Sequence, residues 1–170
     1  VPYEHDDLSS YATRDEKSAA MRKINPIGKI PVLADGEFIL AESMAINLYL
    51  AKKHGRHLWP TGEQEQAKVL QWSFLAVTEL DPPLAQLMVE RTFRKEADRN
   101  AENEKKNADL VMRPLGALEA HLADHDWLVG SNFSVADLNV ASVLMLAPGA
   151  KLDFADYPRL KSWLDRCHDR

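Results

Sequence analysis

The sequence contains a single cysteine, Cys167, among its 170 residues. One thiol cannot form a disulfide within the chain, and it also excludes metal sites built from several thiolates. The sequence has no apolar run that approaches the roughly 20 residues of a transmembrane helix. We therefore expect no membrane partner, and the low cysteine content is compatible with a reducing compartment.

Positive charge is not in excess in this sequence. The chain carries 21 basic and 26 acidic residues, for a formal net charge of −5 at pH 7. Binding to nucleic acid or to an anionic membrane relies on an excess of Lys and Arg, so neither partner is expected. Hydrophobic residues make up 45% and charged residues 28%, which is the ordinary balance of a folded globular protein.

The pattern of the sequence changes at residues 55–62, where Gly and Pro occur without hydrophobic periodicity and predict a linker. Residues 1–54 alternate short strand-like pieces with helical ones, including an expected first strand over 1–6 and a helix over 15–23. Residues 63–170 have helical periodicity. The predicted fold is therefore an α/β domain followed by an all-α domain, an α-helical bundle.

A β-hairpin is predicted inside the first domain. Two apolar runs, 30–33 and 38–40, flank Asp35-Gly36, and glycine adopts the positive φ that such turns need. A helix is expected to begin directly afterwards, at Ser43.

The helical domain shows a clear buried face. Val111, Leu115, Leu118 and Leu122 are spaced by four, three and four residues, which is the period of a helix. Pro82-Pro83 should kink or break an earlier helix, because proline has no backbone N–H.

The sharpest local pattern is Phe133-Ser134-Val135-Ala136-Asp137-Leu138. The Ser134 side chain can accept from the backbone N–H of Asp137, and the Asp137 carboxylate can reach back to the Ser134 N–H. This is a capping box with Asp in the usual Glu position, which indicates a structural role.

Two further patterns have both a functional and a structural interpretation. Pro31 at the start of a strand can hold a cis bond in a tight turn, or can simply mark where the strand begins. Glu42 and Ser43 stand where a strand meets a helix, so they could bind the ammonium and the carboxylate of an amino acid. Alternatively, Glu42 is a negative charge that favours the helix dipole and Ser43 is the N-cap of the helix.

Taken together in this order and spacing, these segments resemble the glutathione transferase family. The matching segments are NPIGKIPVLADGEFILAESMAINLYLAKKHG at 25–55, WLVGSNFSVADL at 127–138 and YPRLKSWLDRCHDR at 157–170. The resemblance implies a glutathione-binding, thioredoxin-like first domain over 1–54 that is partial, because it lacks the first strand and helix. It also implies a helical second domain over 63–170 that shapes the pocket of the acceptor substrate.

The resemblance implies a role for five residues. Pro31 would be a cis-proline, and the backbone of Ile30 would pair with the cysteinyl part of glutathione. Glu42 and Ser43 would hold the γ-glutamyl end. Lys29 would contribute near the backbone or a carboxylate of the tripeptide.

The catalytic residue is expected upstream of Val1. The family places the Tyr, Ser or Cys that activates the glutathione thiolate in its opening strand–helix connection, which the segment beginning at Val1 does not match. Tyr3, Tyr11, Ser9 and Ser10 are therefore not assigned to this role.

The resemblance predicts a cytoplasmic glutathione transferase, usually a homodimer. Glutathione would be a co-substrate, with no permanently bound cofactor, and its thiolate would attack a small electrophilic substrate or a peroxide. The alternative is a binding or scaffolding module of the same fold that has no catalytic activity.

Two remaining candidates have a simpler structural explanation. His121 and His125 have the i, i+4 spacing of a metal pair, but they have little further support and no metal site is predicted. Cys167 belongs to an apolar helix face, which favours a buried, inert thiol.

Overall fold

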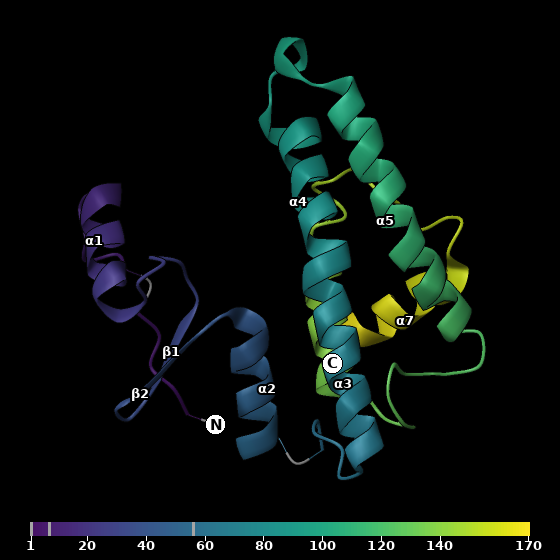
Figure 1. Cartoon of the computed structure of the whole chain (residues 1–170), viewed down its shortest axis with the longest axis horizontal. Coiled ribbons are helices and arrows are strands. Elements are labelled where there is room, and N and C mark those ends of the chain that lie inside the picture. The colour runs from purple at the N-terminus through teal and green to yellow at the C-terminus, as the bar shows by residue number, and fades with distance from the viewer. Residues whose placement is uncertain (1, 7, 56) are drawn as a thin grey trace. The chain divides into compact units, whose positions relative to one another are not determined.

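The computed structural model describes residues 2–6, 8–55 and 57–170. The chain divides into two compact units, unit 1 (Val1–Arg56) and unit 2 (His57–Arg170), and each is described separately. Figure 1 shows the mixed character of unit 1 and the helical character of unit 2. A short β/α region followed by a helical domain is the fold class that the sequence predicted.

The predicted strand over 1–6 is wrong for the residues that the structure describes. Residues 2–6 are exposed and have no regular structure, while Val1 lies outside the described residues. Pro2 has no N–H to donate, and the Asp6 carboxylate accepts from the Leu8 backbone N–H at 2.9 Å, which favours a turn. The sheet in the described residues pairs only β1 with β2, so this segment has no neighbouring strand.

The elements of unit 1 follow local sequence chemistry. The helix predicted over 15–23 is α1 (Arg14–Ile24). It begins with a capping box, in which the Thr13 hydroxyl accepts from the Glu16 N–H at 3.1 Å and the Glu16 carboxylate accepts from the Thr13 N–H at 3.0 Å. These two bonds satisfy backbone donors that a helix start otherwise leaves unpaired.

The predicted hairpin is confirmed. Strands β1 (Val32–Asp35) and β2 (Phe38–Ala41) pair antiparallel, and Gly36 adopts φ of +62° between them. The predicted helix α2 (Ser43–Lys53) follows β2 directly.

One carboxylate ties the hairpin to α2. The Tyr49 hydroxyl donates to Asp35 Oδ2 at 2.6 Å, and the Lys53 ammonium pairs with the same oxygen. The hydrogen bond from Lys53 lowers the pKa of Asp35, and the bond from Tyr49 adds to this effect. These two contacts connect the end of β1, next to the hairpin turn, to α2.

Unit 2 consists of helices. They are α3 (Glu63–Leu75), η1 (Ala76–Leu80), α4 (Asp81–Met88), η2 (Val89–Phe93), η3 (Glu96–Asp98), α5 (Ala101–His121), α6 (Val135–Leu144) and α7 (Pro158–His168). None of the helices in the described ranges combines the length and apolar character needed to cross a bilayer.

The predicted interruption at Pro82-Pro83 occurs as a change of helix type. Regular α-helix ends at Leu75, five residues form the π-helical turn η1, and α4 then carries both prolines in its first turn. Because prolines cannot donate to the carbonyls one turn earlier, the regular α ladder cannot continue through them.

In the core of unit 2, α4 packs against α5 and α3 packs against α6. The predicted apolar face of α5, made of Val111, Leu115, Leu118 and Leu122, is buried as expected. Trp163 of α7 is fully buried as well. The last helix begins at Pro158, as the sequence predicted.

Asp137 connects three segments of this core. The predicted capping box is present, with the Ser134 N–H donating to Asp137 Oδ2 at 2.9 Å. Asp137 Oδ1 also accepts from the Leu128 N–H and from Trp163 Nε1, each at 2.9 Å. One fully buried carboxylate therefore joins the loop before α6, the start of α6 and the middle of α7.

We expect Asp137→Ala to lower the free energy of unfolding by about 3–5 kcal/mol, because three buried N–H donors lose their partner at once. Ser134→Ala should cost less, about 0.5–2 kcal/mol, since it removes the cap and the hydroxyl that donates to Asp137 Oδ2 at 2.9 Å but leaves the three N–H donors with their carboxylate. Denaturant unfolding measures both. The matched control is Asp165→Ala, which removes an exposed carboxylate that pairs with Lys161 at 2.7 Å on α7. Equal losses in Asp137→Ala and Asp165→Ala contradict the assignment.

Candidate functional site

The candidate site lies at the open end of the hairpin, opposite its turn. The register pairs Val32 with Ala41, so Pro31 directly before β1 and Glu42 directly after β2 flank the same end of the hairpin. Lys29 and Ile30 precede Pro31 along the chain, and Ser43 follows Glu42. The binding role of these five residues stays a prediction.

On the first strand, the site presents backbone and an exposed apolar side chain. The Ile30–Pro31 peptide bond is cis, as predicted. The Ile30 side chain is 70% exposed, and Lys29 is exposed as well. A ligand at this edge would meet backbone groups, an apolar surface and a cationic side chain.

On the second strand, the site begins at an unusual backbone conformation. Glu42 is the N-cap of α2 and has φ of +72°, a region that residues other than glycine rarely adopt. Such a conformation costs free energy, and its occurrence is common at ligand sites. Ser43 is the first residue of the helix, so its interpretation as the N-cap is wrong.

The groups at this helix start are free to bind. Glu42 and Ser43 are both exposed, and the Glu42 side chain, at the N-cap position, makes no capping hydrogen bond. The first N–H groups of a helix have no intrahelical acceptor and favour anions. The Glu42 carboxylate beside them favours a cation, so the arrangement can hold both charged groups of an amino-acid end.

The chain matches two family models over most of its length. Residues 1–52 match the model described as glutathione S-transferase, N-terminal domain, and residues 80–170 match glutathione S-transferase, C-terminal domain. The chain belongs to the glutathione S-transferase family. The thioredoxin-like character predicted for the N-terminal region agrees with this assignment.

Relatives and solved structures agree with the family. Glutathione S-transferase stcT of Emericella nidulans is 34% identical over 151 residues, which cover 86% of this chain and 67% of the relative. A theta class glutathione S-transferase from Xanthomonas axonopodis pv. citri, crystallised with glutathione bound, superposes with a TM-score of 0.80 at 26% identity, covering 86% and 71% of the two chains. Elongation factor 1-gamma 2 of Oryza sativa subsp. japonica is 34% identical over 123 residues, covering 72% of this chain and 29% of that protein.

The sequence of this transferase-family chain did not reveal every residue that shapes the site. No role in the site was predicted for Asn25 from the sequence, although its buried side chain donates to the carbonyl oxygen of Lys29. An Asn at the first position of a turn with Pro next and Gly last could have indicated this, because short amides hydrogen-bond to backbone two residues on. Trp163 as a partner of Asp137 had no comparable sequence signal, since the two lie 26 residues apart.

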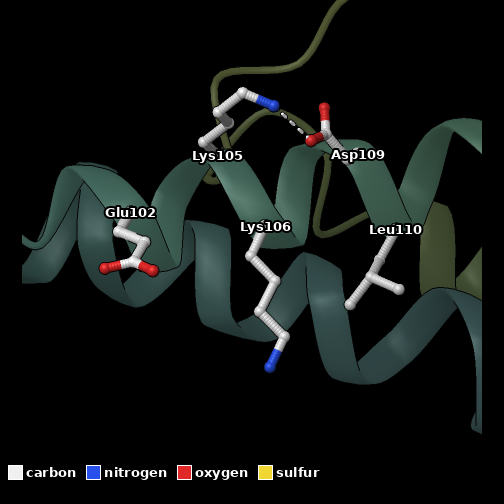
Figure 2. Close-up of a pocket in the computed structure, with 5 residues that line it drawn as sticks. All are labelled: Glu102, Lys105, Lys106, Asp109 and Leu110. Carbon is white, nitrogen blue, oxygen red and sulfur yellow. Dashed lines mark hydrogen bonds and ion pairs between the residues drawn. The ribbon is translucent and has the colours of Figure 1, made fainter.

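A hollow on α5 of this family member does not bring reactive groups together. Figure 2 shows an open hollow on α5 lined by Glu102, Lys105, Lys106, Asp109 and Leu110. Lys105 and Asp109 neutralise each other at 2.5 Å, and Lys106 points away from that pair. All five lining residues come from the single helix α5, and Lys105 and Asp109 already pair with each other, so the hollow offers no convergent set of groups to a substrate.

Glu90 is a buried carboxylate with a structural role. Asn103 Nδ2 donates to its Oε1 at 2.8 Å and the Asn100 N–H donates to its Oε2 at 3.2 Å. These hydrogen bonds lower the pKa of Glu90, and the bond from Asn103 has the largest effect. The carboxylate fastens the start of η2 to the start of α5, and it is fully buried.

The two histidines on and after α5 pack against each other. The rings of His121 and His125 stack with centroids 4.2 Å apart, and Trp72 lies 4.9 Å from His121. Burial, and then the neighbouring His125, lower the pKa of His121. Within the described ranges, no three His, Cys, Asp or Glu side chains gather in a way that could hold a metal ion.

Cys167 is half-buried on α7. Burial raises the pKa of Cys167 to about 12, and the nearby Asp137 carboxylate contributes in the same direction. A thiol must ionise to act as a nucleophile, so Cys167 is not a candidate for the reactive group.

We expect the thiol of the folded chain to react with a disulfide reagent at pH 8 at least about tenfold more slowly than the thiol of the unfolded chain, because its thiolate is rare. Absorbance during the reaction, with and without denaturant, measures the two rates. The rate in the folded state should rise as the pH is raised toward 12. Similar rates in both states at pH 8 contradict the burial argument.

Proposed function

We propose that this chain is a glutathione transferase that binds glutathione at the open end of its hairpin. In this proposal residues 1–54 form the glutathione domain, 55–62 the linker and 63–170 the helical domain that shapes the acceptor site. The observation that carries the proposal is the register of the hairpin, which places Pro31 and Glu42 at one edge beside the start of α2. Membership of the family supports it.

Each proposed contact follows from the chemistry of the tripeptide. The Glu42 carboxylate accepts from the γ-glutamyl ammonium, while the Ser43 hydroxyl and the first N–H groups of α2 donate to the γ-glutamyl carboxylate. The backbone of Ile30 pairs with the cysteinyl part. Lys29 lies beside the tripeptide backbone or a carboxylate.

The proposed reaction is a nucleophilic displacement or addition. The glutathione thiol loses its proton, and the sulfur forms a bond to an electrophilic carbon. In a displacement, the leaving group departs with the electron pair of its bond to that carbon. In an addition, the π electrons of a multiple bond move to its far atom, which then takes up a proton. With a peroxide, the sulfur attacks one oxygen and the O–O bond breaks; the other oxygen takes a proton and leaves as an alcohol or water, so the peroxide is reduced and glutathione is oxidised to its sulfenic acid. The described residues bind and orient glutathione, and holding one reactant in place lowers the barrier by several kcal/mol.

The proposal needs no permanently bound cofactor, since glutathione is consumed as a co-substrate. The second substrate is a small electrophile. A cytoplasmic location fits, because glutathione maintains the reducing state of the cytosol.

We expect Glu42→Ala and Ser43→Ala each to weaken glutathione binding, by about 1–3 kcal/mol for the charge-assisted contact of Glu42 and less for Ser43. Calorimetric titration measures both. The matched controls are Glu37→Ala, an exposed carboxylate at the turn of the hairpin, and Ser18→Ala on α1. If the unmodified chain binds glutathione and all four variants bind equally well, these residues are not in the site.

A second candidate function is a non-catalytic binding module of the same fold. The 34% sequence identity with elongation factor 1-gamma 2 over 123 residues supports this candidate. Turnover of glutathione with 1-chloro-2,4-dinitrobenzene separates the two candidates. Glutathione binding without turnover favours the module, and turnover above the uncatalysed rate favours the enzyme.

We propose that the chain assembles as a homodimer through an apolar stripe on unit 2. Leu70, Phe74 and Val77 follow the spacing of one helix face along α3 and η1, and all three are exposed. Exposed apolar stripes of this kind often mark an interface. A two-fold axis makes one such patch self-complementary.

We expect light scattering after size exclusion to give about 38 kDa, twice the 19.2 kDa of one chain. Phe74→Glu should shift the chain to a monomer, because a charge on the stripe must be desolvated in the interface. The control Phe93→Glu changes an equally exposed ring outside the stripe and should leave the dimer intact. A monomer for the unmodified chain at tens of micromolar contradicts the proposal.

A further inference from the structure

Asn25 stands between α1 and the loop that leads to the proposed glutathione site. Its side chain is only 6% exposed. A buried amide whose polar atoms lack partners costs free energy, so the contacts of this side chain show what it holds in place.

Both halves of the Asn25 amide bond to the same loop. Its Oδ1 accepts from the backbone N–H of Ile27 at 3.2 Å, and its Nδ2 donates to the carbonyl oxygen of Lys29 at 2.9 Å. The first bond closes a turn that Asn favours intrinsically. The second reaches four residues along the chain, to the residue that precedes Ile30.

The backbone of Asn25 makes two further bonds. Its N–H donates to the carbonyl of Met21 at 2.7 Å, at the end of α1, and its carbonyl accepts from the Gly28 N–H at 2.7 Å. One residue therefore fixes the chain from the last turn of α1 as far as Lys29.

Gly28 allows this loop to lie close to α1. It has φ of +72°, and a Cβ atom at this position would lie 3.1 Å from Cγ of Arg22. The loop is thus held from two directions, by the Asn25 amide and by contact with the helix.

We infer that Asn25 is a positioning residue for glutathione. By holding the Lys29 carbonyl, Asn25 sets the direction in which Lys29 and the backbone of Ile30 meet the ligand. The other end of this segment is held by β1, in which Val32 pairs with Ala41. Asn25 itself is buried and does not touch the ligand. This inference rests on the proposed function.

Two substitutions separate the contributions of the amide. Asn25→Asp keeps the acceptor for the Ile27 N–H, but it places an oxygen opposite the Lys29 carbonyl, and two acceptors repel. Asn25→Ala removes both bonds. The matched control is Asn107→Ala in unit 2, because Asn107 is also buried, at 7% exposure, and its Nδ2 donates to the Asn103 carbonyl at 2.7 Å.

Calorimetric titration with glutathione distinguishes positioning from general loss of structure. We expect the Kd to rise about tenfold in both Asn25 variants, which corresponds to the loss of one buried hydrogen-bonding arrangement. The number of sites per chain should stay the same. A purely structural role lowers the number of sites and leaves the Kd of the folded fraction unchanged, as is expected for Asn107→Ala.

Each further outcome has a definite meaning. If the unmodified chain binds glutathione and the folded Asn25 variants bind it within twofold, the inference is wrong and the proposed function stands. If the unmodified chain does not bind glutathione, the proposed function fails and the inference fails with it.

A measurement on the unmodified chain covers the case in which the variants do not fold. By NMR, the side-chain amide protons of Asn25 should exchange with solvent at least about tenfold more slowly than those of the exposed Asn132. Addition of glutathione should shift the backbone amide of Ile30. Equal exchange rates for the two side chains overturn the inference.

Discussion

The helical unit depends on one buried carboxylate. Asp137 receives hydrogen bonds from Leu128, Ser134 and Trp163, each at 2.9 Å. These donors come from a loop, a helix start and the last helix, so their positions are set by a single side chain. A buried carboxylate is costly unless its oxygens are satisfied, and this requirement leaves few alternative arrangements for the three segments.

Unit 1 is organised by polar contacts of a similar kind, on a smaller scale. Asp35 braces the turn of the hairpin against α2, and Asn25 holds the loop at its open end. With only two short strands in the described residues, the hairpin has few ladder hydrogen bonds of its own. Local side-chain bonds therefore define where the strands begin and end.

The proposed site uses backbone as much as side chains. The start of α2 provides free N–H groups, and the segment before β1 presents Lys29 and Ile30 at the surface. Backbone groups cannot change with a point substitution, so the residues that hold them in place have a strong effect on the geometry of binding. Glu42, whose positive φ directs the chain into α2, and Asn25, whose buried amide holds the loop before Ile30, are the two clearest examples of residues that position backbone groups.

Patterns of local chemistry were enough to predict much of this fold. The Asp35-Gly36 turn, the capping box at Ser134 and Asp137, the buried face of α5 and the start of α7 at Pro158 all depend on residues within a few positions of one another. Capping, turn formation and helical periodicity act over such short ranges. They could therefore be recognised before any tertiary contact was known.

Tertiary structure decided the remainder. The sequence predicted a strand over residues 1–6, but strand formation requires a neighbour, and no described strand pairs with the described residues of this segment. The bond from Trp163 to Asp137 likewise depends on how distant segments pack, because the two residues lie 26 positions apart. The sequence by itself determined which residues could cap, turn and bury, because those preferences are local. Only the packed chain decided which buried donors meet Asp137, because contacts between segments far apart in the sequence depend on the tertiary fold.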